Sequence, residues 1–178
     1  MHSRLPALAT AITILLLTAA CATLGGSTHS RGLLFGQVSS EHMAPMRVYI
    51  HQPGKMHWGP FDLTAQVRRD GTFVLRNVRP GAYYLGGVSD GVNIYSLSRR
   101  QGKLIELQPG QIASLGAYHI TGSSQALREG GTLDLTPREH PDELELLERL
   151  SASVAGSEWA TPVRRRLDEV RRAQFDDE

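Results

Sequence analysis

Six side chains that can bind a metal ion fall within sixteen residues in the first third of the chain. They are histidines and methionines, whose imidazole and thioether groups suit copper, especially Cu(I). The six are His42, Met43, Met46, His51, Met56 and His57. A copper site requires several of these groups to converge on one ion, but the pattern predicts a short strand carrying Met46 and His51, with Met43 and Met56 in flanking loops. Ordinary loop and strand roles are therefore favoured, and a copper-binding protein is the alternative hypothesis.

A second candidate is His140-x-x-Glu143, which has the spacing of the short zinc motif of metallocarboxypeptidases. In those enzymes the motif belongs to a separate and much larger α/β domain, which has no counterpart in this sequence. Pro141 inside the motif indicates the start of a helix instead, because proline is tolerated in a first helical turn. We therefore expect these two residues to have a structural role and to bind no metal.

Aromatic residues are the third candidate, since together they could line a sugar-binding or peptide-binding face. They are Tyr49, Trp58, Tyr83, Tyr84, Tyr95 and Tyr118. We expect Tyr83 in the core and most of the others half-buried in a sheet. The chain contains no nucleophile elbow, HExxH, Walker loop or dinucleotide fingerprint. The sequence therefore predicts a protein that is not an enzyme, with no catalytic residues and no cofactor.

The elements that would position these groups are most clearly marked in residues 70–85, DGTFVLRNVRPGAYYL. Asp70-Gly71 predicts a tight turn, because glycine tolerates a positive φ and aspartate caps the turn backbone. Pro80-Gly81 predicts a second turn, of type II, with proline and then glycine at its two central positions. The spacing predicts two antiparallel strands that fold back on each other.

Alternation assigns the faces of the strand between these turns. Phe73 and Leu75 share one face and are expected inside, whereas Thr72 is expected outside. Similar runs occur at residues 35–38, 47–50, 61–67, 105–107 and 112–120. Regularly spaced short strands separated by Gly and Pro turns are typical of a β-sandwich. We therefore predict a mainly β fold over residues 32–122, an antiparallel sandwich of seven to eight strands.

The same region resembles the carboxypeptidase regulatory-like domain. The resemblance lies in D-G-x-F-x-L-x-N-V-x-P-G-x-Y from Asp70 to Tyr83, in the G-x-V of the first strand, and in the later Pro109-Gly110 pair. It covers about half of the chain. It implies a transthyretin-like (prealbumin-like) β-sandwich of the kind that usually serves as an accessory or binding module, and a fold does not by itself assign an activity.

The C-terminal part changes pattern twice. Residues 123–141 contain Gly-Gly and two prolines and predict a loop. Residues 142–178 have helical periodicity, with apolar side chains on one face: Leu144, Leu147, Leu150, Val154, Trp159, Val163, Leu167 and Val170. We predict a helical hairpin that packs on the sandwich or on itself. A partner-binding helix and a membrane-surface helix are the alternatives.

The N-terminus carries Arg4, then an apolar run shorter than the roughly 20 residues that span a bilayer, and then Leu-Thr-Ala-Ala-Cys ending at Cys21. This ending resembles the lipobox of bacterial lipoproteins, in which the cysteine is lipidated and becomes the mature N-terminus. The resemblance implies a signal peptide over residues 1–20 and diacylglycerol and palmitate on Cys21. The small and polar residues after the cysteine predict a flexible tether, so residues 21–31 are expected to form the lipidated N-terminus and tether. Ala22 after the cysteine implies sorting to the outer membrane, with the domain facing the periplasm.

Cysteine content and charge exclude a disulfide and argue against one class of binding partner. Cys21 is the only cysteine, which excludes an intramolecular disulfide. Without residues 1–20 the chain has 18 basic and 18 acidic side chains. Any local excess of basic residues is too small and too scattered to favour nucleic-acid binding. The sequence thus predicts a membrane-anchored envelope lipoprotein, a non-catalytic binding or structural module for an envelope protein or a surface or cell-wall glycan. A periplasmic copper-binding protein is the alternative.

Overall fold

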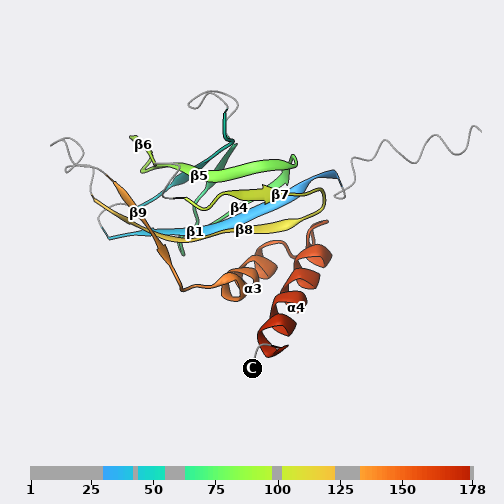
Figure 1. The fold of residues 1–178 in the computed structure, drawn as a ribbon. Helices are drawn as coiled ribbons and strands as arrows, with labels where there is room; N and C mark the ends of the chain where they lie inside the picture. The colour runs from blue at the N-terminus through green and yellow to red at the C-terminus, as the bar shows by residue number, and fades with distance from the viewer. Residues whose placement is uncertain (1–29, 42–43, 55–62, 98–101, 123–132, 177–178) are drawn as a thin grey trace, which may run out of the picture.

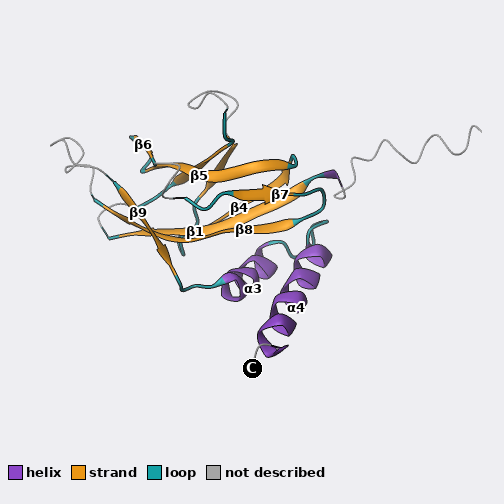
Figure 2. Ribbon diagram, viewed as in Figure 1, coloured by secondary structure: helices purple, strands orange, loops and turns teal. Residues whose placement is uncertain are grey.

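The computed structural model describes residues 30–41, 44–54, 63–97, 102–122 and 133–176. In these residues nine strands form two sheets, and two helices follow them (Figures 1 and 2). The β1 sheet contains, in spatial order, β4 (Thr72–Val78), β1 (Gly32–Ser40), β8 (Ile112–Thr121) and β9 (Asp134–Arg138). The β5 sheet contains β3 (Leu63–Gln66), β2 (Arg47–His51), β5 (Gly81–Ser89) and β6 (Ile94–Ser96), with β7 (Ile105–Leu107) also paired to β5.

The two sheets and the helices make three layers. The β5 sheet packs on one face of the β1 sheet, and the helices α3 (Glu143–Ser153) and α4 (Ala160–Asp176) lie on the other side of it (Figure 1). The prediction of a mainly β sandwich followed by two helices is confirmed. The β1 sheet is the middle layer and is therefore covered on both faces.

The inter-sheet core lies between the two sheets and receives the side chains that alternation predicted to be inside. Phe73 is fully buried there, as are Val48 and Tyr83, and Leu75 is nearly so. These side chains come from both sheets, so the core joins the two layers of the sandwich. Burying an aromatic or aliphatic side chain of this size contributes about 1.5–3 kcal/mol.

The stretch 70–85 forms corners between sheets, and this corrects the predicted fold-back. β4 belongs to the β1 sheet, whereas β3 and β5, its neighbours in sequence, belong to the β5 sheet. Gly71 (φ +81°) ends the first corner, with its N–H bonded to the Arg68 carbonyl. At the second corner Gly81 has φ +149°, which is far from the value that a type II turn requires. The Tyr83 hydroxyl donates to the Arg79 carbonyl across this corner (2.7 Å).

Two further features of the sheet differ from the prediction. β1 and β8 run parallel, so the sandwich is not wholly antiparallel. Parallel neighbours require a crossover, and here the chain passes through the β5 sheet between β1 and β8. Residues 134–138, within the predicted loop 123–141, form the edge strand β9, which pairs antiparallel with β8. Its Pro137 fits an edge position, since proline has no N–H to donate to a second neighbour.

The helix-side core lies between the helices and the outer face of the β1 sheet. It consists of Leu33, Phe35, Ile112, Leu146, Leu147, Leu150, Val154, Trp159, Val163 and Leu167. α3 begins with the capping box of Asp142 and Glu145, in which each side chain accepts a hydrogen bond from the other's backbone N–H. Packing of the helices on the sandwich follows from these contacts, as predicted. Neither helix among the described residues is both long and apolar enough to cross a bilayer.

Packing of α3 on the β1 sheet also explains why Thr72 is buried although alternation predicted it to be exposed. Thr72 was predicted to face outward, and its side chain does point away from the inter-sheet core, yet it is buried. It lies among Phe35, Leu146 and Leu150, under α3. Its hydroxyl also donates to the Asp70 carboxylate (2.7 Å).

The middle of β1 has a point of close approach. A Cβ at Gly36 would lie 2.7 Å from the Phe73 ring and 2.8 Å from the Gly116 carbonyl oxygen. Real Cβ atoms do not approach other atoms this closely, so only glycine fits here. β1 can therefore pass between β4 and β8 while Phe73 stays fully buried.

Candidate functional site

The described members of the histidine–methionine group do not come together. Met46 is 58% exposed just before β2, whereas His51 is buried at the other end of β2, with its ring edge-on to that of Tyr84 at 5.7 Å. Five residues of strand separate the two by roughly 16 Å, which is too far for one ion. His42, Met43, Met56 and His57 lie outside the described residues. Cys21, the predicted lipidation site, also lies outside them.

His140 and Glu143 are not partners. The imidazole Nδ1 of His140 lies 3.3 Å from a carboxylate oxygen of Glu145, while Glu143 accepts two hydrogen bonds from the Arg166 guanidinium in α4. His140, Asp142 and Glu145 do approach one another. Asp142 and Glu145 form the capping box of α3, so their positions serve the start of that helix.

The tyrosines do not form an exposed aromatic face. Tyr83, Tyr84, Tyr95 and Tyr118 are all buried, and Trp58 lies outside the described residues. Burial raises the pKa of the Tyr118 hydroxyl, which accepts a hydrogen bond from the Lys103 N–H (2.9 Å). Tyr49 is half-buried and is the one member of this set that lines a cleft.

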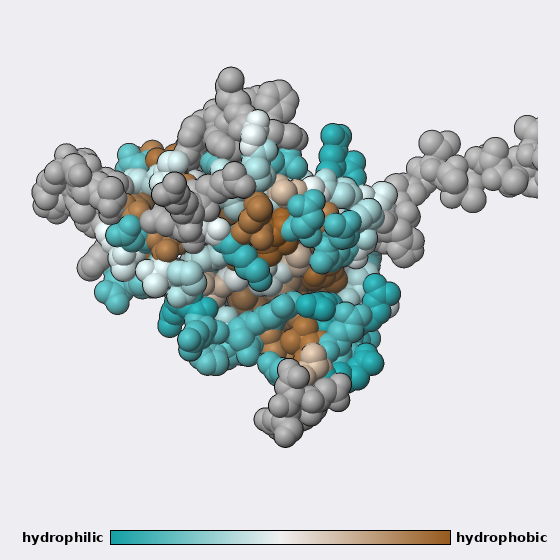
Figure 3. Space-filling view, in the orientation of Figure 1, coloured by the Kyte–Doolittle hydropathy of each residue, from teal (hydrophilic) through white to brown (hydrophobic). Residues whose placement is uncertain are grey.

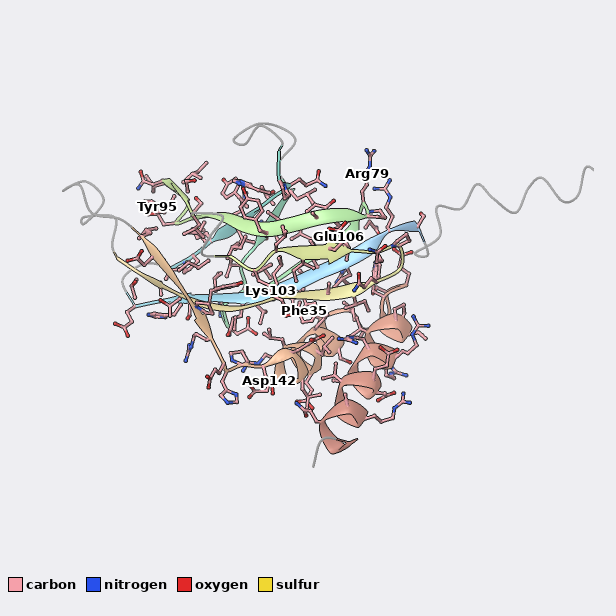
Figure 4. The ribbon with its side chains drawn as sticks, in the orientation of Figure 1. Phe35, Arg79, Tyr95, Lys103, Glu106 and Asp142 are labelled. Carbon is pink, nitrogen blue, oxygen red and sulfur yellow. The ribbon has the colours of Figure 1, made fainter. Side chains whose placement is uncertain are left out.

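That cleft has a volume of about 990 Å³ and opens at the end of the sandwich where β1 ends. Its lining includes Ser39 and Ser40 from β1, the start of β2, the β3–β4 turn and the β5–β6 turn. In Figure 4, Tyr95 of β6 marks this end, whereas Arg79 marks the opposite end, where β1 begins. The cleft and the start of β1 at Gly32 therefore lie at opposite ends of the strand.

A row of side chains across four strands lines part of this cleft. Its members are Gln66, Arg47, Ser89 and Ile94 on β3, β2, β5 and β6, each directly opposite the next. Opposed residues lie on the same face of a sheet. Val48, beside Arg47, points into the inter-sheet core, so the row lies on the outer face of the β5 sheet. All four residues line the cleft.

Arg68 and Arg69 add two further guanidinium groups from the β3–β4 turn. Like Arg47 they are exposed, and none of the three side chains has a hydrogen-bond or ion-pair partner among the described residues. In the helical layer, Arg166 pairs with Glu143 (2.9 Å) and Arg171 with Glu148 (2.8 Å). The cleft gathers three cations that have no partner among the described residues.

The acidic groups around the cleft are occupied by their own turns. Partial burial alone would raise the pKa of Asp70, but hydrogen bonds from the Thr72 hydroxyl and N–H hold it below its usual value. Asp90 accepts from the Asn93 N–H, the Tyr95 hydroxyl and the Val92 N–H, and these bonds lower its pKa to about 2. Both carboxylates are charged at neutral pH and fix the two turns. Asp70 is the one acidic residue in the described lining, so the lining carries a net positive charge.

Apolar side chains lie on the β5–β6 side of the cleft. Val92 is 89% exposed, Ile94 51%, and the Met46 sulfur packs over Gly91. Figure 3 shows apolar surface at this end of the molecule, over the region of β6. The cleft is therefore amphipathic, with arginines from β2 and the β3–β4 turn and apolar groups from the β5–β6 turn.

The sequence contained only a weak signal for this site. Arg68-Arg69 precedes the Asp70-Gly71 turn, and adjacent charges at a turn are expected to be exposed. Arg47 and Ile94 gave no signal, since only strand pairing brings them into one row with Gln66. The fold and this site together define the class: a β-sandwich domain with an open, charged cleft at one end.

The sequence matches no protein-family model and no curated protein. Among solved structures, a DUF3823 family protein from Parabacteroides merdae is similar over 60% of this chain and 46% of its own length, with 17% identity and a TM-score of 0.33. A candidate carbohydrate-binding protein from Pseudomonas aeruginosa is similar over 52% of this chain and 90% of its own length (10% identity, TM-score 0.33). A candidate cell adhesion protein from Bacteroides fragilis is similar over 62% of this chain and 45% of its own length, with 13% identity and a TM-score of 0.29. The chain spans about half the length of the first and third of these. Likeness at this level assigns no function.

Proposed function

We propose that this chain is a lipid-anchored envelope lipoprotein whose β-sandwich is a non-catalytic binding module, with the cleft at the end of β1 as its ligand site. The lipid is carried by Cys21, the anchored membrane is the outer membrane, and the module faces the periplasm. The partner is another envelope protein or a surface or cell-wall glycan.

One observation carries this proposal: the cleft opens at the end of the sandwich opposite the start of β1. β1 begins at Gly32 and reaches the cleft at Ser40. Eight residue steps of about 3.3 Å separate the two ends by roughly 26 Å. An anchor that joins the domain at the first end does not cover the cleft, which stays accessible to a ligand.

The chemistry of the lining favours binding over catalysis. General acid–base catalysis requires a group whose pKa lies near the operating pH. The described lining contains no histidine, cysteine or lysine, and its one carboxylate, Asp70, is held in the ionised state by Thr72. The remaining groups are guanidiniums, hydroxyls, amides and apolar side chains, which bind and orient a ligand.

A site-specific photo-crosslinker tests the location of the ligand site. Replacing the exposed Val92 at the cleft with a diazirine amino acid should give a discrete adduct in intact cells. The matched control places the same residue at Gln108, which is also exposed but lies in the turn beside Arg31, at the end where β1 begins. Equal adducts from both positions, or an adduct from Gln108 alone, would contradict the proposed site.

The anchor has its own test. Wild-type protein should incorporate labelled palmitate, and Cys21→Ser should not, because it removes the one thiol of the chain. The variant should also remain uncleaved and leave the outer-membrane fraction. Equal labelling of both proteins would disprove lipidation at Cys21.

A further inference from the structure

The charge and the shape of the cleft indicate the chemical class of its ligand. Arg47, Arg68 and Arg69 line it without ionic partners among the described residues, and each guanidinium can form two parallel hydrogen bonds with one carboxylate or phosphate. A cleft lined by charges of one sign concentrates counter-ions of the opposite sign, so this lining favours an anionic ligand.

A single small anion would leave most of the lining unused. The cleft has a volume of about 990 Å³, and its arginines come from two places, β2 and the β3–β4 turn. Several negative charges spaced along a chain match this distribution better than one compact anion. The ligand is therefore expected to be a polymer with repeated charges.

The remaining lining distinguishes a sugar from a peptide. The side-chain amide of Gln66 lines the cleft and can both donate and accept hydrogen bonds, as sugar hydroxyls require. Met46, Val92 and Ile94 are exposed at the surface instead of enclosing a deep apolar pocket. A peptide partner would need such a pocket for its anchoring side chains. A pyranose ring instead presents a shallow C–H face together with a polar edge.

From these features we infer that the cleft binds an acidic polysaccharide, with Arg47, Arg68 and Arg69 pairing with its carboxylate or phosphate groups and with Met46, Val92 and Ile94 contacting the C–H faces of its sugar rings. This inference rests on the proposed function, because it assigns a ligand class to the same cleft.

The test uses the full chain in detergent micelles and a decamer of galacturonic acid as the probe. The wild type should bind the decamer saturably at 0.15 M salt, and affinity should fall as salt rises. The methyl-esterified decamer, equal in length but uncharged, should bind at least tenfold more weakly. Polyglutamate of equal charge should also bind at least tenfold more weakly, because it lacks pyranose rings. A hexose phosphate polymer of equal charge, which keeps the pyranose rings, distinguishes phosphate from carboxylate as the preferred anion.

Charge-matched variants locate the binding. The variant Arg47→Gln/Arg68→Gln/Arg69→Gln should lose at least tenfold in affinity. Its control, Arg79→Gln/Arg138→Gln/Arg164→Gln, removes three exposed arginines outside the cleft and should change affinity less than twofold. All six positions are exposed, so both variants should keep the wild-type melting temperature, which circular dichroism verifies.

The outcomes separate this inference from the proposed function. Absence of binding of both the decamer and the hexose phosphate polymer, together with a Val92 adduct in cells, would overturn the acidic polysaccharide and keep the cleft as a binding site. Equal binding of polyglutamate and decamer would reduce the site to nonspecific attraction of anions, or to an acidic protein partner. Equal loss in both triple variants would place the binding outside the cleft.

Discussion

The inter-sheet core and the helix-side core share the β1 sheet but differ in whether their buried polar atoms are hydrogen-bonded. Three tyrosines border the inter-sheet core with bonded hydroxyls: Tyr83 donates to Arg79 and Tyr95 to Asp90, while Tyr118 accepts from Lys103. In the helix-side core the indole N–H of Trp159 is buried with no partner among the described residues. The tyrosine hydroxyls at the first core thus form directional bonds that fix corners and turns, whereas the buried indole N–H of the second core forms none among the described residues.

The strongest way to disrupt the inter-sheet core is Phe73→Ala. The fully buried ring contacts both layers of the sandwich, so its removal should lower the free energy of unfolding by about 3–5 kcal/mol. Urea unfolding followed by circular dichroism measures the loss. Glu106→Ala, an exposed change in β7 (Figure 4), should alter stability by less than about 0.5 kcal/mol. A similar loss in both variants would contradict the assignment of this core.

The corresponding change in the helix-side core is Leu147→Ala, for which we expect a loss of about 2–4 kcal/mol. β1 carries residues of both cores, so both should unfold in one transition, and hydrogen exchange should accelerate most in α3 and α4. Leu147→Met, which nearly conserves volume, should cost less than about 1.5 kcal/mol. Two separate transitions would show that the helical layer unfolds on its own.

Thr72 tests the boundary between the cores. Alternation alone predicts that its replacement is almost silent, but its buried hydroxyl donates to Asp70. Thr72→Val should therefore cost about 1 kcal/mol, and Thr72→Ser, which retains the hydroxyl, should cost less. If the serine variant were the less stable of the two, the methyl group beneath α3 would matter more than the hydrogen bond.

The smallest effect concerns a turn outside both cores. The pKa of Asp90 is lowered to about 2 from a normal value of 3.8. Its bonds with Asn93 and Tyr95 therefore stabilise the fold fully above about pH 4, and this contribution disappears as the pH falls through about 2. Asp90→Asn should flatten the decrease in melting temperature between pH 4 and pH 2 and leave the pH dependence above 5 unchanged. An unchanged slope between pH 4 and pH 2 would refute this role.

Local patterns predicted the elements well where one face of a strand or helix is buried. Phe73, Leu75 and Tyr83 were placed correctly, as were the buried positions of both helices except Leu146. The sheet to which each strand belongs could not be predicted, because Asp70-Gly71 and Pro80-Gly81 specify a change of direction and say nothing of which neighbour the next strand pairs with. The parallel pairing of β1 with β8 is equally non-local.

The candidate site was harder to predict than the fold. The sequence drew attention to histidines and methionines because their chemistry is distinctive, yet Met46 and His51 lie at opposite ends of β2. The cleft depends on Arg47 and Arg68, whose side chains are common on protein surfaces. Their proximity follows from the β2–β3 pairing and from the corner that follows it.

The close approach at Gly36 has a consequence for the alignment of β1 with its neighbours. Leu33 and Phe35 enter one core while Leu34 and Val38 enter the other, so β1 is apolar on both faces. Such a strand could slip by one residue and still bury apolar side chains, because the hydrophobic pattern no longer distinguishes its two faces. A slip would bring Phe35 or Gln37 to the point between Phe73 and Gly116 where not even a methyl group fits. The residue without a side chain thus sets the register of a strand whose hydrophobic pattern leaves it open.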